Sequence, residues 1–393
     1  MKKAVLLFTA VCASTILLSG CTPKSTEVEF SSLGNNFLSM NTQATLVVSD
    51  RFTQEKKDKF EDLCYVISRT LNDINSSLSA NVVNSSVNKF NEAEAGETVE
   101  IDITAYKVLS LAKEVYTLTD GYYNPAIYYN VQAYGFNEAS DMDKPLDERI
   151  PHNYVIGKYN ELSSHFGEIE ITKDTSNKCY ATKPTKTVEI DGVTYSMKID
   201  LGGIGKGYAA DEVNKIIDEY GFKYGYFSFG TSSIAVKEHY LNGDYNLSFT
   251  NPRSDIEGNA YLSTAIKNKN ISTSGDYEQY FLYDTDGDEV KERYCHVFDP
   301  TTGRPVQTDI MSATVIGGSA AEDDALTTAI MAMGRKNAVE FINEKLSDRQ
   351  VVFTYDNNGK YEIITNLPQG NYKVMHSKFE VVSTLSDGKI IIG

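Results

Sequence analysis

The spacing of apolar positions predicts one N-terminal strand and three amphipathic helices. Residues 42–49 (TQATLVVS) are rich in β-branched residues and are typical of a strand. Three later stretches place apolar residues three or four positions apart, which gathers them on one buried face of a helix. The predicted stripes are Phe60, Leu63, Cys64, Ile67, Leu71 and Ile74; Ala105, Val108, Leu109, Ala112, Val115 and Tyr116; and Ala209, Val213, Ile216, Ile217 and Tyr220.

The remaining pattern mixes short strands, turns and two further helices. Polar residues predict a loop over 72–91 and an irregular excursion over 137–185, while 188–201 is strand-like with a hairpin turn at Asp191-Gly192. Short strands fill 225–298, and a strand at 310–317 precedes helices at 319–333 and 335–346 and the terminal strands. This order predicts an α/β (α+β) fold, with a mixed, largely antiparallel sheet core and packed helices.

The first 20 residues are predicted to be a lipoprotein signal peptide. Lys2 and Lys3 precede an uncharged, mostly apolar run over 4–18, shorter than the roughly 20 residues of a membrane span. The run ends in Leu18-Ser19-Gly20-Cys21, which resembles a lipobox. We therefore expect Cys21 to carry lipid, residues 21–37 to form a tether, and the protein to be anchored on the extracytoplasmic face of the cell membrane. The alternative is an ordinary signal peptide with a chance cysteine.

The composition of the chain excludes several classes of protein. Hydrophobic residues make up 41% and charged residues 23% of the 393 positions, which excludes a polytopic membrane protein and a mostly disordered chain. The net charge of −17 argues against nucleic acid as the main partner, since phosphate binding needs clustered Lys and Arg. After the signal, Cys64, Cys179 and Cys295 remain. An odd number excludes a full disulfide framework, and no Cys/His cluster indicates zinc.

A glycine-rich segment, IDLGGIGKGYAAD over 199–211, is the first candidate for chemistry. Glycines let the backbone approach a ligand closely, and a helix N-terminus favours an anion. The segment is not a Walker A loop, because Asp200 stands where that motif needs Gly and Gly207 where it needs Ser or Thr. A tight strand-to-helix turn without a ligand is the equally weighted alternative.

The segment SAAEDDALTT over 319–328 is the second candidate. Ser319 and Glu322 form a capping box that begins a helix. Asp324 and Thr328 then lie one turn apart on one face, where a carboxylate and a hydroxyl suit Mg²⁺. The alternative is that the acidic residues only complement the helix dipole.

Three polar turns are less specific taken singly. His296 precedes the turn Asp299-Pro300, and a lone His is more often structural than catalytic. Residues 272–277 (STSGDY) form a small polar turn. Residues 284–288 (DTDGD) look like a calcium loop, but Glu289 and Cys295 occupy positions that need Gly and Glu, which leaves a hairpin turn as the interpretation.

Together, four of these segments, at 199–211, 272–277, 296–305 and 319–328, resemble the ApbE family of FAD:protein FMN transferases over residues 38 to 355. Residues 119–125 (TDGYYNP), with Tyr134-Gly135-Phe136, are similar to the family's G-x-F-D-P…W-G-F stretch, and Met40-Asn41-Thr42 is similar to its M-G-T. The resemblance implies domains at 1–20 (signal), 21–37 (tether), 38–370 (transferase) and 371–393 (C-terminal strands).

The resemblance also implies a set of site residues. Mg²⁺ would be held by Asp324, Thr328 and the backbone carbonyl of Gly203, and His296 matches a suspected catalytic histidine. Asn81 stands where some family members have an aromatic residue over the flavin. Asn124 replaces the family's usual Asp, and Tyr134 replaces its Trp. The residues implied to line the FAD site are Met40, Asn81, Tyr122, Tyr123, Asn124, Asp200, Lys206 and Phe298.

The implied reaction is Mg²⁺-dependent transfer of FMN from FAD to a threonine hydroxyl of a client flavoprotein, with release of AMP. Clients in this family carry an acceptor motif of the form D-x-x-T/S-G-A-T. Two alternatives stay open: an Mg²⁺-dependent FAD pyrophosphatase that gives FMN and AMP, and a non-catalytic flavin-binding lipoprotein. Asp324, Thr328 and His296 together argue against the latter, because storage of a flavin requires no base.

Overall fold

A computed structural model describes residues 29–136, 149–253 and 257–392 of the chain. The predicted signal peptide and Cys21 lie outside these residues. Within the described ranges, no helix is both long and apolar enough to cross a bilayer.

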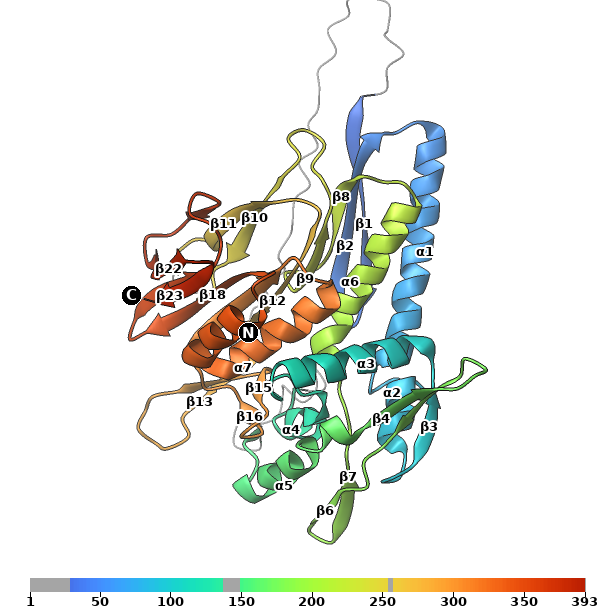
Figure 1. Ribbon diagram of the computed structural model, residues 1–393, viewed down its shortest axis with the longest axis vertical. Helices are drawn as coiled ribbons and strands as arrows, with labels where there is room; N and C mark the ends of the chain where they lie inside the picture. The colour runs from blue at the N-terminus through green and yellow to red at the C-terminus, as the bar shows by residue number, and fades with distance from the viewer. Residues whose placement is uncertain (1–28, 137–148, 254–256, 393) are drawn as a thin grey trace, which may run out of the picture.

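One nine-stranded sheet forms the centre of the molecule (Figure 1). All neighbouring pairs are antiparallel except the last, β19 with β21. This arrangement confirms the predicted mixed, largely antiparallel sheet. In spatial order the strands are β1 (Phe30–Ser39), β2 (Thr42–Arg51), β8 (Tyr224–Phe229), β9 (Ser233–Val236), β12 (Lys269–Gly275), β17 (Ile310–Ile316), β18 (Gln350–Asn357), β19 (Lys360–Thr365) and β21 (Phe379–Val381).

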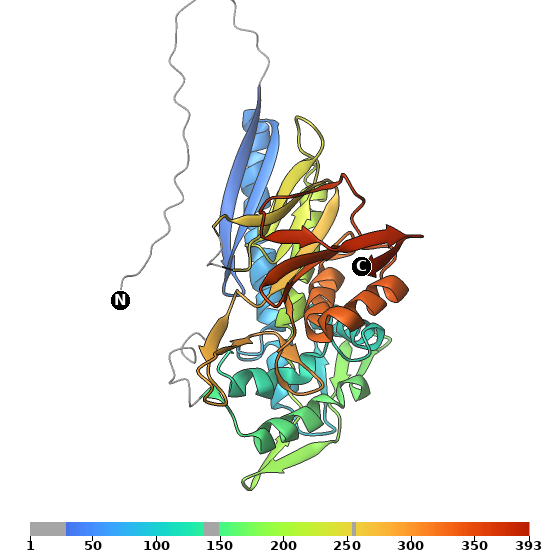
Figure 2. The same ribbon diagram turned by 90° about the vertical axis from the view of Figure 1, so that its left-hand side faces the viewer.

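Three long helices cover one face of this sheet (Figures 1 and 2). They are α1 (Gln54–Leu78), α6 (Gly202–Glu219) and α7 (Ala320–Lys345), and α7 lies directly over β12 and β17. Every residue of β17 is buried, because α7 covers one side and a second apolar cluster, which includes Tyr261, Met311 and Phe379, covers the other. The sheet centre is therefore shielded from water on both faces.

Smaller elements extend the body below and beside the sheet. The helices are α2 (Ser86–Glu92), α3 (Ile103–Leu118), α4 (Tyr128–Ala133), α5 (Asn153–Ser163) and the 3₁₀ turns η1 (Pro125–Ile127) and η4 (Phe166–Glu168). The small sheets are β3 (Thr98–Ile101) with β5 (Cys179–Thr182) and β4 (Glu170–Lys173), and β10 (Tyr245–Thr250) with β11 (Ala260–Ile266) and β20 (Tyr372–Val374). Two-stranded pairs are β6 (Thr187–Ile190)/β7 (Val193–Ser196), β13 (Tyr280–Tyr283)/β14 (Glu292–Cys295), β15 (Phe298–Asp299)/β16 (Arg304–Pro305) and β22 (Ser383–Ser386)/β23 (Lys389–Ile392).

Several sequence expectations agree with this fold in detail. The turn between β6 and β7 has positive φ at Asp191 and Gly192, as the hairpin prediction requires. Residues 284–288 connect β13 to β14 as a hairpin. Helix α7 is broken at Gly334, with φ 68° and ψ 167°, which is the break expected between helices at 319–333 and 335–346. Cys64, Cys179 and Cys295 are free thiols.

Other expectations were wrong where tertiary contacts overrode polar composition. The loop expected over 72–91 contains the end of α1 and all but the last residue of α2, and the excursion over 137–185 contains α5, β4 and β5. The tether expected through residue 37 ends by Phe30, because β1 pairs with β2 along its whole length. Beyond residue 371, β21 joins the main sheet and β20 pairs with β11, so these strands belong to the same body.

Candidate active site

The glycine-rich segment forms the first turns of helix α6 rather than a loop. Asp200 Oδ1 accepts a hydrogen bond from the Gly202 amide at 2.7 Å, and this side chain secures the helix start because Leu201, the N-cap residue, provides no cap. The Asp200 amide donates to the Pro125 carbonyl at 2.8 Å, which joins the start of α6 to η1. Burial raises the pKa of the Asp200 carboxyl.

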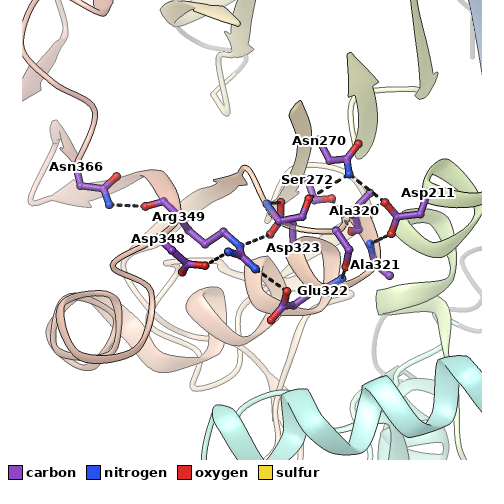
Figure 3. Close-up of polar contacts among 12 residues, drawn as sticks. Asp211, Asn270, Ser272, Ala320, Ala321, Glu322, Asp323, Asp348, Arg349 and Asn366 are labelled. Atoms are coloured by element: carbon purple, nitrogen blue, oxygen red, sulfur yellow. Dashed lines mark hydrogen bonds and ion pairs between the residues drawn. The ribbon is translucent and has the colours of Figure 1, made fainter. Parts of the chain in front are cut away.

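The start of helix α7 is held by a polar network, shown in Figure 3. Ser319 is the N-cap residue, and its side chain accepts from the Glu322 amide as the capping box predicts. Asp211 of α6 accepts from the amides of Ala320 and Ala321 at 2.8 and 3.0 Å. A carboxylate at these free amides complements the positive end of the helix dipole, so α6 fixes where α7 begins.

A buried ion pair supports the same helix start (Figure 3). Arg349 Nε lies 3.3 Å from Asp323 Oδ1, and its Nη2 lies 2.7 Å from Glu322 Oε2. Asp323 is fully buried, and burial raises the pKa of its carboxyl to about 7, although the Gly318 amide and Arg349 oppose this shift. Of the three acidic residues at 322–324, Glu322 and Asp323 therefore stabilise the start of α7. Asp324 contacts α6.

Helices α6 and α7 approach most closely at Gly207. A Cβ placed there would lie 2.1 Å from the Ala320 carbonyl oxygen and 2.7 Å from the Ala321 Cα. The Gly207 amide donates to Asp324 Oδ2 at 3.0 Å. Glycine is required here for helix contact, which gives Gly207 a packing role.

Near Asp324, Gly203 of α6 lies beside Thr328 of α7 and the ring of Tyr123. A Cβ placed on Gly203 would lie 3.5 Å from both Thr328 Oγ1 and Tyr123 Cε2, so these residues face one another. Asp324 is 3% exposed, and burial raises the pKa of its carboxyl, although the Lys206 charge and the Gly207 amide oppose the shift. A carboxylate, a hydroxyl and a carbonyl are the hard oxygen donors that Mg²⁺ prefers, so the residues present fit that ion.

Lys206 and His296 are further charged or titratable residues near this cluster. Lys206 Nζ donates to the Gly202 carbonyl at 3.4 Å, and its charge acts to lower the pKa values of Asp200, Asp324 and His296. Burial lowers the pKa of His296 to about 4, and the nearby Lys206 charge is the second cause of this shift. The imidazole is therefore neutral at physiological pH. His296 Nδ1 is 3.4 Å from the Gln279 carbonyl, and because a carbonyl only accepts, Nδ1 carries the proton and Nε2 its lone pair.

The other residues implied to line the flavin site are placed less directly. The Tyr122 hydroxyl accepts from Asn337 Nδ2 at 3.2 Å, Met40 lies in the β1–β2 turn with φ 50°, and Asn81 is exposed between α1 and α2. Among the described residues, the side chains of Met40 and Asn81 make no hydrogen bond to the cluster around Asp324.

Two of the residues implied to line the flavin site also have structural partners within the chain. The Asn124 side chain accepts from the Ala126 amide and donates to the Ser163 carbonyl, so it caps η1 and ties it to α5. The Phe298 side chain is 1% exposed and packs among aromatic rings that include Tyr134 and Phe136.

Asp211, Asn270 and Arg349 are positioning residues that sequence reasoning missed. Asn270 Nδ2 donates to Asp211 Oδ1 at 3.0 Å and to the Gly318 carbonyl at 3.1 Å. The residues around the start of α7 that these three side chains contact are 26 to 110 positions away in the chain, so no local pattern marks them. The helix pattern gave no signal for Asp211, because this residue lies on the face opposite the stripe of Ala209 and Val213, where a polar residue is expected.

The fold and the cluster define a class of protein: a mixed α/β protein in which a buried aspartate of α7 meets the glycine-rich start of α6. The chain belongs to the ApbE family, whose sequence model matches residues 40–353.

Named relatives agree with this membership. The FAD:protein FMN transferase of Buchnera aphidicola subsp. Schizaphis graminum (strain Sg) is 29% identical over 275 residues, 70% of this chain and 73% of the relative. The FAD:protein FMN transferase of Vibrio cholerae serotype O1 (strain ATCC 39541 / Classical Ogawa 395 / O395) is 25% identical over 345 residues, 83% of this chain and 87% of the relative. A solved structure, the flavin transferase ApbE from Vibrio cholerae, superposes with a TM-score of 0.67 at 21% identity, covering 86% of this chain and 97% of that one. That likeness supports the fold.

Proposed function

We propose that this protein transfers FMN from FAD to a threonine hydroxyl of a client flavoprotein and releases AMP. The observation that carries the proposal is the convergence of Asp324, Thr328 and Gly203 beside Lys206 and His296. Family membership and the names of the relatives agree with it. FAD is the substrate, and the client is a flavoprotein with an accessible threonine.

In this proposal Mg²⁺ is held by Asp324, Thr328 and the carbonyl of Gly203. The ion would supply positive charge to the diphosphate oxygens as the bond between the two phosphates breaks. Lys206 contributes a second positive charge on the same side, and it orients the diphosphate by attraction. Asp200 fixes the start of α6, so the carbonyl of Gly203 is held in place by the helix.

His296 is the proposed base. The threonine oxygen attacks the phosphorus of the FMN half, a new P–O bond forms, and the bond from that phosphorus to the bridging oxygen breaks, so AMP leaves with that oxygen. His296 Nε2 accepts the hydroxyl proton and releases it to solvent. An imidazole with a pKa of about 4 is a weak base but is always available in its neutral form at pH 7.

The test is to incubate the protein with FAD, Mg²⁺ and a client domain that carries a threonine acceptor. The intact mass of the client is then measured by mass spectrometry. Transfer predicts a mass increase of one FMN per client and one AMP released. A client variant with the threonine replaced by valine is the matched control and should gain no mass. Equal release of FMN and AMP with the client unchanged in mass would overturn transferase activity in favour of FAD pyrophosphatase.

We also propose that Cys21 is lipidated and holds the protein at the membrane, and the fold then indicates an orientation. Eight residues separate Cys21 from Phe30, whose ring stacks on Tyr240 and contacts Tyr224 at the start of β8. That end of the molecule also contains the C-terminal end of α6 (Figure 1). Because α6 has 18 residues, the candidate active site lies about 27 Å along the helix from this end of the molecule.

A Cys21→Ser variant tests the anchor. It should leave a soluble domain with full transfer activity, because the substituted residue precedes the first strand. If the variant still fractionates with membranes after a salt wash, the lipid anchor is wrong.

A further inference from the structure

The hydroxyl of Tyr123 is buried without a hydrogen-bond partner. Tyr123 is 3% exposed, and its hydroxyl oxygen contacts no donor or acceptor among the residues that the structure describes. Leaving a hydroxyl unpaired in the interior costs free energy, and nearly all buried polar groups in native proteins are paired. An unpaired hydroxyl in this position therefore indicates a partner that is not part of the chain.

The surroundings of Tyr123 indicate where that partner lies. Its ring lies beside Gly203 on the side where Gly203 also faces Thr328. The ring is held in that position at its base, because the Tyr123 amide donates to Thr119 Oγ1 at 3.1 Å. The hydroxyl is close enough to Asp324 and Asp200 for both charges, after burial, to raise its pKa well above the ordinary value.

Neither nearby carboxylate accepts from this hydroxyl in the described structure, although Asp200 Oδ1 accepts from the Gly202 amide and Asp324 Oδ2 from the Gly207 amide. The hydroxyl therefore has a proton to donate to an acceptor that enters the site. An anionic oxygen that reaches Lys206 and the cation held by Asp324 passes beside this donor, and a nucleotide diphosphate has oxygens of that kind.

We propose that the Tyr123 hydroxyl donates a hydrogen bond to a diphosphate oxygen of the bound nucleotide. The inference rests on the proposed function for the choice of ligand. It assigns to Tyr123 recognition of the diphosphate rather than contact with the flavin ring. The bond would orient the phosphorus that is attacked, and the energy lost in leaving the hydroxyl unpaired in the free protein would be recovered when the nucleotide binds.

The experiment compares Tyr123→Phe with Tyr261→Phe. Tyr261 is the matched control, because its hydroxyl is also buried and unpaired but lies in the second apolar cluster, beside Phe249 and Phe379. The affinities for ADP, FAD, riboflavin and Mg²⁺ alone are measured by calorimetry or fluorescence. Thermal melting of the ligand-free proteins is measured in parallel.

Tyr123→Phe should bind ADP and FAD about 10- to 100-fold more weakly, the range for a lost hydrogen bond to a charged group. Riboflavin, which has no phosphate, and Mg²⁺ alone should bind as to the wild type. The ligand-free melting temperature should be unchanged or higher, because the substitution removes an unpaired polar group. Tyr261→Phe should leave all four affinities unchanged.

Four outcomes would overturn the inference. If Tyr123→Phe binds ADP within twofold of wild type while wild type binds FAD, Tyr123 has no such role and the proposed function stands. An equal loss of affinity for Mg²⁺ alone would assign the hydroxyl to the water shell of the metal. A lowered ligand-free melting temperature with normal ADP affinity would show an internal partner. If wild type binds neither FAD nor ADP, the proposed function fails together with the inference.

Discussion

The amide of Gly207 and the carboxylate of Asp324 are joined by a hydrogen bond of 3.0 Å, so helix α6 itself orients the one acidic side chain at the proposed metal site. This contact is possible because the two helices are closer here than a Cβ would allow. The separation of α6 and α7 and the direction of the Asp324 carboxylate are therefore coupled.

Gly207→Ala should force the two helices apart. The added Cβ would lie 2.1 Å from the backbone oxygen of Ala320, which no side-chain rotation can relieve. We expect a loss of about 1–3 kcal/mol in the free energy of unfolding, typical of overpacking, and a loss of Mg²⁺-dependent activity. Gly157→Ala is a suitable control, because a Cβ there meets nothing within 4 Å. A wild-type melting temperature for Gly207→Ala would contradict the close approach.

Asp324→Asn separates the charge of this residue from its hydrogen bond. An Asn can still accept from the Gly207 amide, and removing a buried charge should leave the metal-free melting temperature equal to or above that of wild type. Asp324→Ala removes both and should be less stable. Both variants should lose the rise in melting temperature that Mg²⁺ gives the wild type. Unchanged activity of Asp324→Asn at saturating Mg²⁺ would contradict the metal assignment.

His296→Ala should lower the rate of FMN transfer by about 10²–10⁴-fold, the usual range for loss of a general base. FAD affinity should be largely kept, because proton removal matters only in the transition state. A structural histidine would give weaker FAD binding or a lower melting temperature with a small change in rate. Single-turnover transfer at saturating FAD, with FAD affinity measured in parallel, decides between the two.

The same histidine sets the expected pH dependence. Its pKa in the folded protein is lowered to about 4, against an ordinary value near 6.5. Protonation of His296 should therefore not lower kcat/KM between pH 8 and about 5. The unfolded chain binds more protons than the folded one between about pH 6.5 and 4, so this group lowers stability as the pH falls through that window. A wild-type kcat/KM that falls with an apparent pKa near 6.5, and a His296→Ala variant without that step, would contradict the lowered pKa.

Arg349→Met should destabilise the start of α7. The substitution leaves Asp323 buried without its cation, and breaking a buried pair costs about 3–5 kcal/mol. The pKa of Asp323 is already raised to about 7, so the folded protein binds more protons than the unfolded one between about pH 4 and 7. The stability that this group contributes is present at low pH and is lost as the pH rises. The free energy of unfolding of the variant should therefore fall further below that of wild type at pH 8 than at pH 5. Thermal melting at the two pH values checks this, and an equal loss at both would contradict it.

The sequence alone determined the parts of this protein that depend on neighbouring positions. Apolar spacing located α1, α3 and α6, the dipeptide Asp191-Gly192 located a hairpin, and Ser319 with Glu322 located the start of α7. Each of these signals acts within one or two turns of chain, where side-chain period and capping are decided locally. The order of the motifs was enough to indicate the family.

Only the tertiary structure decided which of these residues make structural contacts within the chain. Asn124 caps a turn and Phe298 is packed among aromatic rings, while Asp211, Asn270 and Arg349 hold α7 from remote segments. The polar stretch over 72–91 forms helix because α1 and α2 bury its apolar residues against the body. Burial and long-range hydrogen bonds depend on residues far apart in the chain, so composition and local spacing do not predict them.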